Sequence, residues 1–245
     1  MKQNQPIKQF LVLESIIYVV FTMIDIGSNN PTWIQINVAL KLLSIGLCLA
    51  FLVHVSYANP ANLDSRLMVL IIGFTLASDV LLLLTRQFIY GLVLFIIVQL
   101  LYSVRIQKKF NIKSALIKGF IFVLTLIFFV ILLPLQFSYA LMLSLGAFYA
   151  LLFAWNLIRL TLVPLKRSET SVDSKSLYDR RLFIIGMVLY ALCDLNVAIY
   201  NFPSYFESNV LMTRIYEASA FAMWSFYLPG QVALTLSVRR KVDGK

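Results

Sequence analysis

The sequence predicts an all-α protein: a polytopic helical membrane protein of about eight transmembrane helices with both termini in the cytoplasm. Of its 245 residues, 60% are hydrophobic and only 13% are charged, and the mean hydropathy is +0.86. A soluble globular domain is far less apolar. Apolar runs of about 20 residues, long enough to cross ~30 Å of hydrocarbon as a helix, recur along the whole chain.

Eight apolar segments are expected to form these helices. The whole chain, 1–245, is predicted to be a single transmembrane helical domain with no soluble domain. Its longest connection is a mixed-charge cytosolic loop at about 164–181. In chain order, the eight segments are 9–26, 33–55, 67–85, 88–104, 115–133, 137–160, 182–200 and 218–238.

The first segment is interpreted as a transmembrane helix and not as a cleaved signal peptide. It ends at Asp25 instead of a small-residue cleavage site, and another apolar segment follows at once. The two cysteines, Cys48 and Cys193, both fall inside predicted helices. They therefore indicate neither a disulfide nor an oxidising compartment.

The distribution of basic residues predicts the orientation. Most of the 21 lysines and arginines fall in alternate loops and at the termini, whereas the other loops hold only Arg86 and Arg214. By the positive-inside rule the basic side is cytoplasmic, and an even number of helices returns both termini to it. We expect a multi-pass integral membrane protein, in the cytoplasmic membrane if the source is bacterial. The net charge of +10 then reflects loops beside anionic headgroups, and no nucleic-acid partner is expected.

Asp79 and Asp194 are the candidate catalytic residues because each lies deep inside an apolar segment. A carboxylate in hydrocarbon costs on the order of 2.5–3.5 kcal/mol, so an acid at this depth indicates function. Each lies 13 residues beyond a basic residue at the expected cytoplasmic start of its helix (79 − 66 and 194 − 181). Both carboxyl groups are therefore expected ~20 Å from the inner boundary. Lys41, in the second segment, is expected to reach about the same level.

Each of these three residues shares a helical face with a polar neighbour three or four positions away, and two further pairs follow the same spacing. A polar seam of this kind must face the protein interior or a water-filled cavity. The pairs are Asn37 with Lys41, Thr75 with Asp79, Gln99 with Tyr102, Tyr190 with Asp194, and Tyr227 with Gln231.

Two interpretations of this seam stay open. In the first, Lys41 neutralises one aspartate and the remaining groups form hydrogen bonds that fix helix packing. In the second, the seam is catalytic. One lysine cannot neutralise two carboxylates, so the second acid stays protonated or shares a proton with the first. Two acids with separated proton affinities are suited to general acid–base chemistry.

Other polar residues give weaker signals. Glu14 and Arg159 are expected near the cytoplasmic boundary, within reach of lipid headgroups. His54 is the only histidine and no cysteine cluster accompanies it, so neither a metal nor a cofactor is predicted. The sequence contains no HExxH, G-x-S-x-G or glycine-rich phosphate loop.

Several segments resemble the YhhN-like lysoplasmalogenase family of eight-helix membrane proteins. Asp79 follows a small residue and precedes Val-Leu-Leu, like the family's D-x-L-L. Arg181 to Gly186, with Cys193-Asp194 after it, is similar to the family's R-x-x-x-x-G followed by S-D. Lys41-Leu-Leu stands where the family has K-P-L, Gly91 to Tyr102 is similar to G-x-x-x-F-x-x-x-H-x-x-Y, and Tyr227 and Gln231 are similar to residues of the last family helix.

The resemblance implies an ether-bond hydrolase that cleaves the vinyl-ether bond of lysoplasmalogens to a fatty aldehyde and a glycerophospho-alcohol. Its partners would be the lysophospholipid substrate and membrane lipids, with no cofactor. Asp79 and Asp194 would divide the acid and base roles, and Lys41 would set which of them is ionised. Substrate or water would be positioned by Lys41, Gln99, Tyr102, Tyr190, Tyr227 and Gln231.

The sequence departs from the family where the histidine is replaced by Gln99. A glutamine can hydrogen-bond but cannot exchange a proton near neutral pH. Two other functions are therefore retained. One is a proton- or cation-coupled membrane transporter, suggested by the buried acids. The other is a catalytically silent lipid-binding relative, suggested by Gln99.

Overall fold

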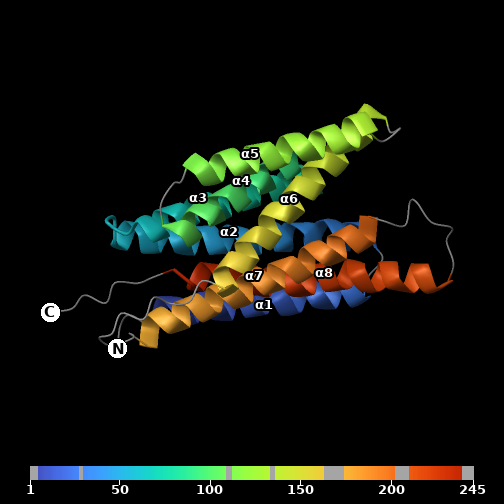
Figure 1. Cartoon of the computed structure of the whole chain (residues 1–245). Coiled ribbons are helices and arrows are strands. Elements are labelled where there is room, and N and C mark those ends of the chain that lie inside the picture. Colours follow the sequence, from blue (N-terminus) through green and yellow to red (C-terminus); the bar gives the residue numbers. More distant parts are fainter. Residues whose placement is uncertain are drawn as a thin grey trace. The chain divides into compact units, whose positions relative to one another are not determined.

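The computed structural model describes residues 5–27, 30–108, 112–132, 136–162, 174–201 and 210–238. These residues form helices and contain no strand, which confirms the all-α prediction (Figure 1). The elements are α1 (Gln5–Gly27), α2 (Pro31–Ala58), α3 (Leu63–Leu83), α4 (Phe88–Gln107), α5 (Ile112–Leu126) with its π-helical continuation η2 (Ile127–Leu132), α6 (Phe137–Leu162), α7 (Ser174–Asn201) and α8 (Val210–Leu236).

Among the described residues, seven helices are long and apolar enough to cross a membrane. They are α1 to α7, with most of η2 counted as part of α5. α8 is 27 residues long but is not one of them; its sequence includes Pro229, Gly230 and Gln231, which lower its hydropathy. The chain is therefore a multi-pass membrane protein. The eighth span and the cytoplasmic position of both termini stay predictions.

The structure corrects the predicted loop at about 164–181. α7 begins at Ser174, so the second part of that range is helical, while residues 163–173 lie outside the described residues. Polar residues such as Asp179 and Arg180 end the hydropathy signal without ending the helix. A helix can extend beyond the hydrocarbon into the headgroup region, where charged side chains are well solvated.

Asparagine caps explain where two of the helices begin. Asn30 precedes α2, and its side-chain oxygen accepts a hydrogen bond from the backbone N–H of Thr32 at 3.0 Å. Asn62 precedes α3 and accepts one from the N–H of Asp64 at 3.1 Å. Each cap satisfies a donor that the first turn of a helix leaves without a partner.

The chain divides into two compact units. Unit 1 comprises residues 1–59 and 168–245 and contains α1, α2, α7 and α8. Unit 2 comprises residues 60–167 and contains α3 to α6 with η2. Each unit is described by itself below, and the single transmembrane domain stays a prediction.

Glycines bring α7 and α8 close together in unit 1. A Cβ atom added at Gly186 would lie 2.7 Å from Leu234 Cγ and 3.0 Å from the Gly230 carbonyl oxygen. Real side chains do not tolerate the first distance, so this contact requires glycine at position 186. Close backbone approach at small residues is the usual basis of helix association in lipid.

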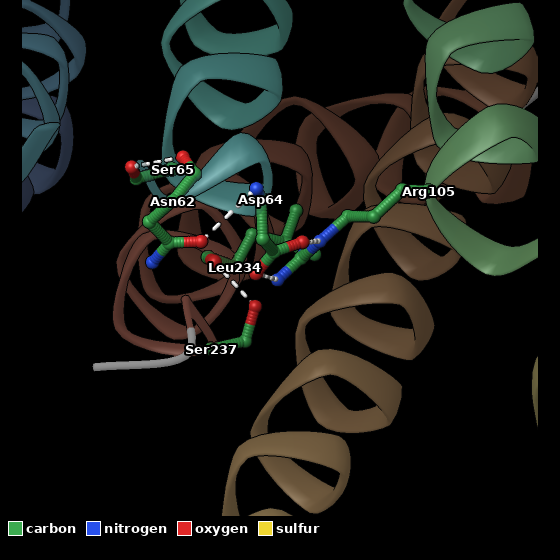
Figure 2. A network of polar contacts seen from close by, with 6 residues as sticks. All are labelled: Asn62, Asp64, Ser65, Arg105, Leu234 and Ser237. Carbon is green, nitrogen blue, oxygen red and sulfur yellow. Dashed lines mark hydrogen bonds and ion pairs between the residues drawn. The ribbon is translucent and has the colours of Figure 1, made fainter. Parts of the chain in front are cut away.

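In unit 2, hydrogen bonds and an ion pair join α3 to α4. Ser78 Oγ donates to the carbonyl of Gly91 at 2.6 Å. At the other ends of these helices, Arg105 forms a two-point ion pair with Asp64, with Nε–Oδ1 at 2.7 Å and Nη2–Oδ2 at 3.0 Å (Figure 2). Paired contacts of this kind fix orientation as well as distance. Together these contacts link α3 and α4 near both of their ends.

Candidate functional site

The predicted site residues are divided between the two units. Unit 1 contains Lys41, Tyr190, Asp194, Tyr227 and Gln231. Unit 2 contains Asp79, Gln99 and Tyr102. The common depth of Asp79 and Asp194 stays a prediction.

In unit 1, the carboxylate that pairs with Lys41 is Asp25. Lys41 Nζ lies 2.9 Å from Asp25 Oδ2 and 3.1 Å from Oδ1, and the two side chains are 8% and 22% exposed. Asn37 Nδ2 donates to Asp25 Oδ1 as well. Asn37 and Lys41 thus share a helical face, as predicted from their spacing, and both contact the same carboxylate.

This ion pair changes the interpretation of Lys41. The sequence predicts that Lys41 neutralises Asp79 or Asp194, and it marks Asp25 only as the end of the first segment. α1 ends at Gly27 and α2 begins at Pro31, so a short connection places an acid in the last turn of α1 beside a base in the third turn of α2. An acid and a base flanking so short a connection is the signal that could have identified the pair.

Aromatic rings surround the Lys41 ammonium. Lys41 Nζ lies 4.6 Å from the ring centroid of Trp224 and 5.5 Å from that of Phe21. The Trp224 ring in turn contacts Tyr227 at 5.4 Å between centroids, and Tyr227 contacts Tyr190 at 5.6 Å. The structure thereby joins three predicted residues, Lys41, Tyr227 and Tyr190, in one cluster through Trp224, which the sequence did not single out.

Asp194 and Gln231 each follow a tyrosine of this cluster by one helical turn. Asp194 is half-buried on α7, and Gln231 is fully buried on α8. Within the described residues, neither the Oε1 nor the Nε2 atom of Gln231 has a hydrogen-bond partner. A buried amide left without partners costs about 1–3 kcal/mol per group, so such an amide points to a bound water or ligand.

In unit 2, Asp79 is 5% exposed on α3. Ser78 beside it and Thr75 one turn earlier are completely buried. The Thr75 hydroxyl donates to the carbonyl of Ile71 at 2.9 Å, a bond within its own helix. A carboxyl group therefore lies in the interior of this unit, as the depth of its segment predicted.

A hydrogen-bonded amide pair orients Gln99, which is fully buried on α4. Asn156 Nδ2 of α6 donates to the backbone carbonyl of Gln99 at 2.8 Å and to its Oε1 at 3.1 Å. Ser103 Oγ donates to Asn156 Oδ1. Gln99 Nε2 has no hydrogen-bond partner among the described residues, so this N–H group can donate to a bound water or ligand. Tyr102, one turn away, is also fully buried.

Glu14 is enclosed within unit 1, and its depth relative to the headgroups stays a prediction. It is 5% exposed, and its carboxyl accepts hydrogen bonds from Ser44 Oγ and, at 3.6 Å, from Cys48 Sγ. Small side chains on α2 leave room for the Glu14 side chain between the two helices, so it turns inward. Arg159 is half-buried, with its guanidinium 4.9 Å from the Trp155 ring.

Comparison with known proteins agrees with the motifs. The model of the YhhN family matches residues 36–238. The match includes all eight predicted site residues and confirms the resemblance noted in the sequence. No curated protein and no solved structure matches the chain.

Proposed function

The chain belongs to the YhhN family, and we propose that it is an integral membrane hydrolase that cleaves the vinyl-ether bond of lysoplasmalogens. The products would be a fatty aldehyde and a glycerophospho-alcohol. The observation that carries this proposal is the family match together with the retention of both intramembrane aspartates in their motifs. The burial of Asp79 supports it, because a carboxyl group held inside a membrane helix is costly and indicates a functional role.

The proposed reaction begins with proton transfer from one aspartic acid to the outer alkene carbon of the vinyl ether. This gives an oxocarbenium ion, which the second, ionised aspartate stabilises. Water adds to the cation and loses a proton to the ionised aspartate, forming a hemiacetal. The hemiacetal then collapses to the aldehyde and the free alcohol. Asp79 and Asp194 would divide these two roles.

The contacts of Lys41 refine its proposed role. Because Asp25 compensates its charge, Lys41 is not required to set which catalytic aspartate is ionised. We propose instead that Lys41 belongs to the cluster with Trp224, Tyr227 and Tyr190 and holds the Trp224 ring in place through its ammonium group. This cluster would position the substrate, together with the amide of Gln231, which has no hydrogen-bond partner in the described part of the chain.

Gln99 would act as a hydrogen-bond donor. Its Oε1 is engaged by Asn156, which leaves Nε2 for a substrate oxygen or the attacking water. It cannot relay a proton near neutral pH, so all proton transfer in this proposal rests on the aspartates.

The test is an aldehyde assay with detergent-purified protein, in which alkenyl and acyl lysophospholipids are compared at equal concentration. We expect aldehyde from the alkenyl lipid, and a loss of about 10²–10⁴-fold in rate for Asp79→Asn and for Asp194→Asn. Melting temperatures within a few degrees of the unmodified protein would show that the variants fold. A folded aspartate variant that releases aldehyde at the unmodified rate would overturn the mechanism.

The replacement of the family histidine by Gln99 favours one alternative, a lipid-binding protein without catalytic activity. The same samples distinguish the two functions. An alkenyl lysophospholipid that raises the melting temperature but yields no aldehyde would identify the silent relative.

A further inference from the structure

A cavity of about 500 Å³ lies among α4, α5 and α6 of unit 2. Most of its wall is apolar and includes Leu100, Leu101, Phe122 and Phe148. Lys118 of α5 lines the same cavity. None of the predicted site residues lines it, so this cavity is a separate feature of the unit.

Lys118 is the one buried side chain of α5 among the described residues and is only 9% exposed. Its charged neighbour is Arg159 of α6, which is also positive. Neither forms an ion pair within the described residues. The cavity therefore combines an apolar wall with one lining cation, Lys118, and the charge of Arg159, which does not line the cavity, acts on that cation. Neither cation has a counter-charge in the described part of the chain.

Such an arrangement requires an anion. A cation inside a membrane helix normally pairs with an acid or extends to a headgroup, because desolvation without compensation is costly. The Arg159 guanidinium is held over the Trp155 ring at 4.9 Å, which limits its orientation. A guanidinium beside an ammonium matches a phosphate group, which accepts hydrogen bonds from both.

We propose that this cavity binds a membrane phospholipid, with the phosphate at Lys118 and Arg159 and one hydrocarbon chain along the apolar wall. The phosphate supplies the missing negative charge, and the hydrocarbon chain packs against the apolar wall. The proposal does not depend on the hydrolase activity, because it uses none of the residues assigned to that reaction.

Gly119 allows the chain-binding part to be tested without changing any charge. It lines the cavity, and a Cβ atom there would meet no atom within 4 Å. Gly119→Leu therefore fills the cavity and leaves both cations in place. Gly146 of α6 has the same open surroundings but does not line the cavity, so Gly146→Leu is the matched control.

The experiment measures the melting temperature of the full-length, detergent-purified protein during titration with three probes. These are a short-chain phosphatidylglycerol, the diacylglycerol with the same chains, and inorganic phosphate. We expect only the phospholipid to raise the melting temperature. Lys118→Met and Gly119→Leu should each weaken its apparent affinity about tenfold or more, whereas Lys118→Arg, Gly146→Leu and the exposed Lys8→Met should leave it unchanged.

Each contrary result has a defined meaning. An equal shift with inorganic phosphate would show a free-anion site, and an equal shift with diacylglycerol would show that the phosphate is not recognised. An unchanged phospholipid response in both Lys118→Met and Gly119→Leu would show bulk lipid effects only. Any of these would overturn the proposal. If Lys118→Met fails to fold, Gly119→Leu decides the outcome, since it keeps every charge.

Discussion

Two polar clusters, one in each unit, are held inside membrane-spanning helices in different ways. In unit 1, Lys41 is compensated by the charge of Asp25 and enclosed by the rings of Trp224 and Phe21. In unit 2, Gln99 and Asn156 form a neutral network in which hydrogen bonds replace charge compensation. Removing one partner of the ion pair should lower the free energy of unfolding more than removing one partner of the neutral network, because an unpaired ion then remains in a poorly hydrated place. The neutral network should lose less stability when one of its members is removed.

The largest loss of stability is expected from Asp25→Ala, which leaves the Lys41 ammonium without its carboxylate. Breaking a buried ion pair from one side costs about 3–5 kcal/mol, with the lower value expected here because Asp25 is 22% exposed. The free energy of unfolding can be measured by denaturant titration in mixed micelles. The double variant Asp25→Ala with Lys41→Met should recover part of the loss. A double variant as unstable as the sum of both single variants would contradict charge compensation.

A smaller loss is expected in unit 2 from Asn156→Ala. This change removes two donated hydrogen bonds to Gln99 and the acceptor for Ser103. Hydrogen bonds between membrane helices contribute about 0.6 kcal/mol each, so the loss should be about 1–2 kcal/mol. The same titration measures it. Asn196→Ala, which removes one exposed bond within α7, is the control and should change stability little. A loss of stability as large as that caused by Asp25→Ala would contradict the difference between the ion pair of unit 1 and the neutral network of unit 2.

Trp224→Leu separates the aromatic contribution from the ionic one in unit 1. It keeps the Lys41–Asp25 pair but removes the ring over the ammonium at 4.6 Å. A desolvated cation–π contact contributes about 1–2 kcal/mol. Measured in the background of Lys41→Met, the same substitution should cost less, and the difference between the two values is the contact energy. A difference near zero would show that Trp224 acts by packing alone.

The smallest effect is expected from Ser78→Ala, which deletes a single bond from Oγ to the Gly91 carbonyl. We expect a loss of about 0.6 kcal/mol in the free energy of unfolding, the usual value for one such bond in a membrane protein. Aldehyde release should be retained if Ser78 serves only helix packing. A large loss of activity in a stable Ser78→Ala protein would instead add this residue to the proposed site beside Asp79.

The helical architecture was predictable because it depends on local composition. Long apolar runs required helices, and the seven membrane-competent helices lie where those runs were found. The start of α7 was predicted eight residues late, at 182 instead of Ser174 (182 − 174). Hydropathy records the hydrocarbon-spanning part of a helix and not its polar extension. The burial of Asp79 was predictable for the same local reason.

The contacts between polar side chains of different helices were less predictable, because they depend on which helices pack together. Hydropathy marks Asp25 only as the end of the first segment, and its pairing with Lys41 depends on the short connection that brings α1 and α2 side by side. Glu14 is expected to reach headgroups because it lies within about a turn or two of the expected cytoplasmic boundary, and the sequence does not reveal that Ser44 and Cys48 of α2 bind its carboxyl group. Asn156 gave no signal at all, because a single amide in an apolar helix does not reveal which backbone it contacts.

The close contact of α7 and α8 limits how the protein can open. With Gly186 against Leu234 and the Gly230 carbonyl, sliding one helix past the other by a turn would bring a larger side chain against backbone atoms. Tyr190 and Tyr227 therefore keep a fixed register, and the two helices should move as one rigid body. Any gating motion that admits a lipid must then occur at the borders of this helix pair and not within it.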